Sequence, residues 1–148
     1  GMFFNISLET GKTELIHAVI EGICYHLRWQ LEAQEKKVKT SPVIRFVGGG
    51  ALAPLTCQML SDMLGRKIET VESPQNAGSV GAALLVAVGL GIINSLAEAK
   101  KLVEVTECYA PNMSNKAIYD DAFEVFKALY KCNKKNFYKL NEFQAKLS

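Results

Sequence analysis

The sequence VIRFVGGGALAPLTCQMLSDMLG, residues 43–65, joins three features that decide the fold. Residues 43–47 follow a proline and predict a short buried strand. Three glycines, residues 48–50, then turn the chain. Residues 52–63 carry apolar side chains at helical spacing, and Gly65 ends that predicted helix. A strand therefore leads directly into a helix through a corner of three consecutive residues without side chains. We call residues 48–50 the glycine corner.

The rest of the chain is predicted to be mainly helical. Apolar residues recur every three to four positions from residue 13 to residue 36, which is typical of a long helix. A short apolar run at residues 68–71 predicts a second strand, and small residues at 77–90 predict another helix. After Pro111 a third long amphipathic helix is expected over about residues 115–140. We expect a single domain over residues 1–148.

The order strand, helix, strand, helix favours parallel strands with right-handed crossovers, and hence an α/β layer fold. Two strands are too few to cover helices on both faces. Either Phe3–Leu8 or Val103–Thr106 adds an edge strand, or further strands lie outside this chain.

Composition and charge exclude several classes of protein. The 148 residues are 49% apolar and carry a net charge of +2 spread along the chain, so a nucleic-acid partner is not expected. The four cysteines are dispersed and predict reduced thiols in a cytoplasmic protein. The longest apolar run, residues 80–90, is too short to cross a membrane.

The glycine corner is a candidate anion site, because free amides and a helix terminus at the carboxyl end of a parallel strand attract phosphate. The alternative is a tight turn without a ligand. A P-loop is excluded, since no Lys-Ser or Lys-Thr pair follows the glycines. The dinucleotide pattern G-x-G-x-x-A fits Gly48 to Ala53 formally, with Glu69 or Glu72 at about the expected distance. NAD-type binding therefore stays open as a third hypothesis.

Four blocks in order carry a resemblance to a known family. They are ELIHAVIEGICYHLR (14–28), GGGALAPLTCQMLSDMLGRKI (48–68), AGSVGAALLVAVGLG (77–91) and YAPN (109–112). Together they resemble the C-terminal, ATP-binding domain of FGGY carbohydrate kinases, and xylulose and gluconate kinases in particular. The resemblance implies a partial ribonuclease H-like, or actin-like ATPase, domain that helps to transfer the γ-phosphoryl group of ATP to a sugar or polyol hydroxyl.

The nucleotide-binding residues that the resemblance implies are Gly48, Gly49, Gly50, Ala51 and Pro54. In several relatives a polar side chain, often asparagine, stands where this chain has Pro54. Proline cannot donate that hydrogen bond, so base recognition would depend on backbone and shape. The implied cofactors are ATP and the Mg²⁺ that accompanies it, for which no protein ligand is identified in this chain.

Two further side chains are candidates for supporting the corner: Glu21 and Gln58. Glu21 is either a buried carboxylate that hydrogen-bonds the glycine corner or an ordinary residue facing solvent. Relatives show the same Glu-Gly pair, which favours the first.

No catalytic residue is assigned. Asp62, Asp120 and Asp121 fall on predicted helices without a partner motif and are interpreted as surface residues. In the family, the catalytic aspartate and the sugar site belong to the N-terminal domain, so this chain alone is expected to be inactive. His17 and His26 lie on opposite faces of one helix, so no shared metal site is expected. A domain cut from a larger sheet would expose backbone donors and apolar surface. The second hypothesis is therefore a non-catalytic α/β docking module or subunit that packs on the rest of a larger protein or on a second copy as a homo-oligomer.

Overall fold

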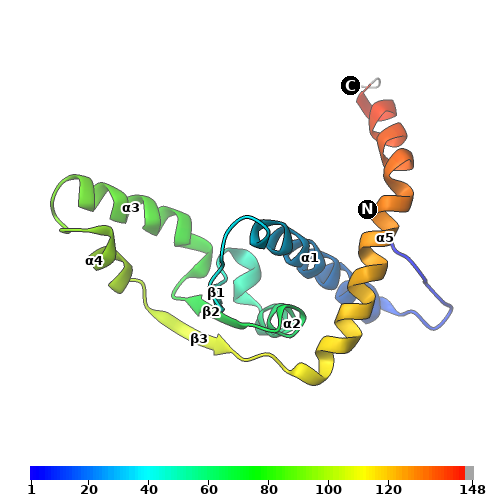
Figure 1. Ribbon diagram of the computed structural model, residues 1–148, viewed down its shortest axis with the longest axis horizontal. Coiled ribbons are helices and arrows are strands. Elements are labelled where there is room, and N and C mark those ends of the chain that lie inside the picture. Colours follow the sequence, from blue (N-terminus) through cyan, green and yellow to red (C-terminus); the bar gives the residue numbers. More distant parts are fainter. Residues whose placement is uncertain (146–148) are drawn as a thin grey trace.

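The structure is a computed structural model that describes the backbone of residues 1–145 and the side chains of residues 1–142 (Figure 1). Residues 146–148 of the predicted domain lie outside the described part. The elements in chain order are α1 (Lys12–Glu35), β1 (Val43–Arg45), the 3₁₀ helix η1 (Gly49–Leu52), α2 (Pro54–Leu64), β2 (Lys67–Val71), the 3₁₀ helix η2 (Pro74–Asn76), α3 (Ala77–Gly89), α4 (Leu96–Lys101), β3 (Val105–Tyr109) and α5 (Met113–Ala145).

The three strands form one sheet in the order β1-β2-β3. β1 and β2 run parallel, with Ile44 opposite Ile68, as the strand–helix–strand order requires. β3 runs antiparallel to β2, with Glu69 opposite Cys108. The α/β class and the parallel pair of strands are therefore confirmed, and the third strand adds an antiparallel edge.

The extra edge strand comes from the second of the two candidate segments. β3 at Val105–Tyr109 overlaps residues 103–106, while Phe3–Leu8 contains no strand. The chain reaches β3 by a hairpin of two helices, α3 and α4, and returns along β2 in the opposite direction (Figure 1). In a βαβ unit the connecting helix crosses the sheet, so the next strand runs parallel to the first. α3 and α4 do not cross the sheet in this way, so β3 can run antiparallel to β2.

Local sequence explains where α2 begins and ends. Pro54 occupies the first helical position, where its missing N–H costs nothing because that donor has no partner within the helix. Gly65 ends the helix in the left-handed conformation, with φ of 62°. An L side chain at this position would be strained, so the glycine fixes the turn into β2.

The core lies between α1, α2, β2 and α5. Tyr25 of α1 stacks on Phe123 of α5 with ring centroids 6.0 Å apart, and Trp29 meets Tyr130 edge to face at 5.5 Å. The buried residues that form the core cluster are Cys24, Tyr25, Cys57, Met59, Leu60, Met63, Ile68 and Phe123. α2 is thus enclosed by α1 and α5, which come from opposite ends of the chain.

α3 lies outside this core. It projects with α4 to one side of the molecule, while the second half of α5 projects to the other (Figure 1). α3 contains no buried residue although its sequence, AGSVGAALLVAVG, is almost entirely apolar. No described helix combines the length and the apolarity that crossing a bilayer requires.

Candidate functional site

The glycine corner sits at the carboxyl end of β1 and is held by backbone hydrogen bonds. Gly48 has φ of 92°, a conformation that an L side chain rarely adopts. Its N–H donates to the carbonyl of Pro74 in η2 at 2.8 Å. Its own carbonyl accepts from the N–H of Ala51 at 3.1 Å, which closes η1. The corner is therefore tied to the loop that follows β2, the neighbouring parallel strand.

Two amides of the corner have no acceptor. Gly49 and Gly50 are exposed, and no described residue accepts a hydrogen bond from the N–H of either. The N–H groups of Leu55 and Thr56, at the start of α2, also have no acceptor among the described residues. Consecutive free amides next to a helix N-terminus form an arrangement that favours a bound anion.

The glycines keep one side of this corner open. A Cβ on Gly49 would meet no heavy atom within 4 Å, so the space beside its Cα is open. A Cβ on Gly50 would lie 3.1 Å from the ring of Phe46, which leaves little room on the protein side. An anion can therefore approach Gly49 from the solvent without obstruction.

The other predicted nucleotide-binding residues frame the corner without polar side chains. Ala51 is buried and Pro54 is exposed. Leu52 and Ala53 between them are exposed and apolar. The segment from Ala51 to Pro54 thus offers a nucleotide only backbone groups and hydrocarbon.

Gln58 is engaged away from the corner. Its side-chain amide donates to Oδ1 of Asp62 at 2.7 Å and to the carbonyl of Ala110 at 2.9 Å. The bond to Ala110 connects α2 to the loop between β3 and α5, whereas the bond to Asp62 lies within α2. Gln58 therefore fixes the position of α2 relative to that loop.

Asp62 is buried, and its interpretation as a surface residue is wrong. Only 4% of the residue is exposed. Besides Gln58, it accepts hydrogen bonds from the N–H of Asn112 and from the side chain of Asn115, both at 2.8 Å. The sequence signal that could have indicated this role is the asparagine of the YAPN block, whose backbone Asp62 binds.

Asp120 is held between two cations. One carboxylate oxygen lies 2.7 Å from Arg28 Nη1, and the other lies 2.6 Å from Lys116 Nζ. The hydrogen bond from Lys116 is the main cause that lowers the pKa of Asp120, and Arg28 lowers it further. Asp121, its neighbour, is exposed. Since Asp62 and Asp120 are both occupied by donors, neither is free to act as a general base.

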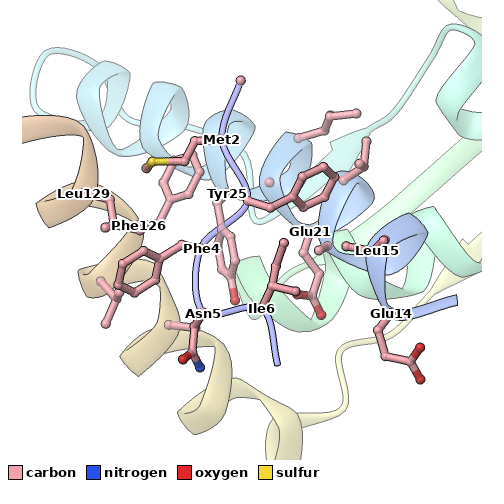
Figure 2. A pocket seen from close by; sticks show the side chains of 18 of the residues that line it. Met2, Phe4, Asn5, Ile6, Glu14, Leu15, Glu21, Tyr25, Phe126 and Leu129 are labelled. Atoms are coloured by element: carbon pink, nitrogen blue, oxygen red, sulfur yellow. The ribbon is translucent and has the colours of Figure 1, made fainter. Parts of the chain in front are cut away.

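Glu21 lies elsewhere. It lines an open cavity of about 1100 Å³ bounded by the N-terminal segment, α1 and α5 (Figure 2). Figure 2 shows its side chain beside Ile6, with Tyr25 of the same helix next to it and Phe126 of α5 beyond. Among the described residues, no hydrogen bond connects Glu21 to the glycine corner. The lining is largely apolar, so this cavity suits an apolar group that packs against it better than a charged ligand.

The cysteines fall into two classes. Cys24 and Cys57 are fully buried, whereas Cys108 and Cys132 are exposed, and all four are free thiols. Burial is the main cause that raises the pKa of Cys24 to about 11. Cys24 is therefore a neutral core thiol and not a nucleophile.

The described residues do not fit a resident metal site. Within the part of the chain that the structure describes, no three His, Cys, Asp or Glu side chains gather closely enough to hold a metal ion. The free amides of the corner, in contrast, fit the oxygens of a phosphate group. Any Mg²⁺ would have to be held by groups other than a cluster of these side chains.

Residues 1–90 match the C-terminal domain of the FGGY family of carbohydrate kinases, which is more than half of the chain. The chain belongs to this family. The matched FGGY domain includes the glycine corner, α2 and all of α3.

Curated relatives of this FGGY chain are sugar kinases. It is 33% identical to xylulose kinase of Staphylococcus epidermidis over 137 residues, which cover 90% of this chain and 27% of the relative. It is also 33% identical to xylulose kinase of Lactococcus lactis, over 97% of this chain and 29% of the relative. A glycerol kinase of Saccharolobus islandicus is 29% identical over 131 residues. The chain thus spans under a third of the length of these relatives.

Solved structures share the fold of this FGGY domain. Ligand-bound xylulose kinase from Lactobacillus acidophilus superposes with a TM-score of 0.82 at 24% identity, and covers 94% of this chain and 28% of that one. Gluconate kinase from the same organism gives 0.81 at 24% identity. The expected FGGY-type α/β fold is confirmed by this agreement.

Proposed function

We propose that this chain is the ATP-binding portion of a carbohydrate kinase that transfers the γ-phosphoryl group of ATP to a sugar or polyol hydroxyl. The single observation that carries the proposal is the pair of exposed amides at Gly49 and Gly50, which have no acceptor among the described residues. They stand at the carboxyl end of β1, where α/β folds bind phosphates. Membership of the FGGY family supports the same role.

In this proposal the chain binds and orients the nucleotide. The amides of Gly49 and Gly50 donate to phosphate oxygens, and the N-terminal end of α2 adds its partial positive charge. Ala51 and Pro54 contact the nucleoside through backbone and hydrocarbon. Mg²⁺ would arrive with ATP and neutralise phosphate charge when bound. Gln58 supports the corner only indirectly, through the position of α2, and Glu21 has no role in this proposal.

The test is a titration of the full chain with ATP, followed by the amide NMR signals of residues 48–51. We expect these signals to shift selectively at millimolar ATP, because half of the binding site of an FGGY kinase is contributed by the rest of the protein. Gly49→Ala should weaken the response, since its methyl group would occupy the open approach. Gly89→Ala is the matched control, because a Cβ at Gly89 also meets nothing within 4 Å. Unchanged signals at residues 48–51 would refute the nucleotide role.

Alone, the chain should not phosphorylate a sugar. Phosphoryl transfer needs a carboxylate that orients and deprotonates the attacking hydroxyl. Asp62 and Asp120 are bound by donors and cannot supply it. A coupled assay for ADP with xylulose, gluconate and glycerol should therefore give no sugar-dependent turnover, and turnover with any of them would contradict this part of the proposal.

A second candidate function is a non-catalytic docking module or subunit. The exposed apolar face of α3 favours it, because Leu85 and Val86 are each 60% exposed. Such a surface would pack on the rest of a larger protein or on a second copy. Sedimentation should reveal self-association at high concentration; a clean monomer would count against this function. The third hypothesis, NAD-type binding, fails if NAD leaves the amide signals of residues 48–53 unchanged in the same titration.

A further inference from the structure

The glycine corner is fixed at both of its ends, and the two ends are held differently. At its start, the N–H of Gly48 donates to the backbone of Pro74. At its end, the carbonyl of Ala51 accepts a hydrogen bond from a side chain, the Cys57 thiol, with Sγ and O 3.6 Å apart. Between these two ties lie the free amides of Gly49 and Gly50. The thiol bond is the only side-chain bond to this corner in the described residues.

Local sequence explains why a side chain is needed there. In a continuing 3₁₀ helix, the carbonyl of Ala51 would accept from the N–H of the third residue on. That residue is Pro54, which has no N–H. The N–H of Cys57 itself is bonded to the carbonyl of Ala53 at 3.2 Å, and no other described backbone donor reaches Ala51. Without the thiol, this carbonyl of a buried residue would have no partner in the described part of the chain.

The thiol is suited to a constant donor role. Cys57 is fully buried in the core cluster. Burial is the main cause that raises the pKa of Cys57, and the nearby charge of Glu107 raises it further. The sulfur therefore keeps its proton at neutral pH, which it must do in order to donate.

We propose that Cys57 is a positioning residue for the phosphate site: its thiol holds the Ala51 carbonyl and so keeps the amides of Gly49 and Gly50 aligned toward one ligand. The inference rests on the proposed nucleotide role of the corner. A bond to sulfur is weak, so its loss should loosen the corner and not unfold the domain.

The chain contains a matched control. Cys24 is also fully buried, belongs to the same core cluster, and makes no described hydrogen bond to the corner. Cys57→Ala and Cys24→Ala therefore remove the same atoms from the same core, and only the first removes the bond to Ala51. Cys57→Ser keeps a donor at that position and serves as the rescue variant.

The experiment measures two quantities on the full chain. The first is the dissociation constant for ATP and for inorganic tripolyphosphate, from amide shifts of residues 48–51. Cys57→Ala should weaken both by about threefold, the size expected for one modest hydrogen bond, while Cys24→Ala and Cys57→Ser stay near the wild type. The second is amide hydrogen exchange of residues 48–53 without ligand, which Cys57→Ala alone should accelerate.

Each outcome is decisive. If Cys57→Ala and Cys24→Ala change exchange at the corner equally, Cys57 acts only as core filling and the inference is wrong. If Cys57→Ser behaves like Cys57→Ala, the donor is not the reason, and the inference is also wrong. If the wild type binds neither ATP nor tripolyphosphate, the proposed function fails, while the exchange data still decide whether the thiol holds the corner.

Discussion

Two helices of similar length, α2 and α3, use apolar residues in opposite ways. Seven of the eleven residues of α2 are buried, whereas none of the thirteen in α3 is. α2 is enclosed by α1, β2 and α5, and it starts at the glycine corner. α3 starts after β2 and η2 and projects from the body (Figure 1). The comparison teaches that α2 is buried by three elements of the described chain, whereas α3 meets η2 and α4 and keeps an exposed apolar surface.

The largest expected effect separates the two helices directly. Met63→Ala removes a fully buried side chain of α2 and should lower the free energy of unfolding by about 2–5 kcal/mol, because a cavity remains. Leu85→Ala in α3 should change it by less than about 0.5 kcal/mol, since that side chain is already exposed. Urea denaturation followed by circular dichroism measures both. A comparable loss for Leu85→Ala would mean that α3 is packed in solution, and the contrast would disappear.

A smaller effect is expected from the polar contacts of α2. Asp62→Ala leaves the donors of Asn112, Asn115 and Gln58 without their shared acceptor, which should cost about 1–3 kcal/mol in the free energy of unfolding. Asp121→Ala, on the exposed face of α5, is the control and should be close to neutral. Equal urea midpoints for the two variants would show that the buried carboxylate does not join α2 to α5.

The smallest expected effect concerns pH. Because Lys116 and Arg28 lower the pKa of Asp120 in the folded state, its charged form favours folding. This contribution is present above the ordinary carboxyl pKa and is lost as pH falls below about 4. Asp120→Asn should therefore flatten the acid side of the stability profile. The change should be slight, since the carboxylate is 41% exposed and screened by solvent. If the wild type and Asp120→Asn lost stability in the same way at acid pH, the ion pairs of Asp120 would not contribute.

Much of the element order could be predicted because it depends on local patterns. The helical spacing at residues 13–36 corresponds to α1, and the glycines mark the corner between β1 and α2. Gly65 ends α2 as its sequence position indicates. These features need only the propensities of neighbouring residues.

The remaining features depend on residues far apart in the chain. Asp62 has no local signal for burial, since two of its donors, Asn112 and Asn115, come from about fifty residues later. The antiparallel direction of β3 follows from how α3 and α4 return the chain. The thiol bond of Cys57 to Ala51 spans only six residues, yet no propensity of the intervening residues predicts that this thiol reaches that carbonyl. The apolar composition of α3 does not by itself reveal which surface of that helix is exposed.

The bonds from Gln58 and Asp62 to residues 110–115 have a mechanical consequence. They join α2, whose first turn adjoins the corner, to the base of a helix of 33 residues. Such a helix is about 50 Å long, so a tilt of about 5° at its base would displace its tip by about 4 Å. A small rotation of α2 that carried the base of α5 with it would therefore be several times larger at the far end of that helix.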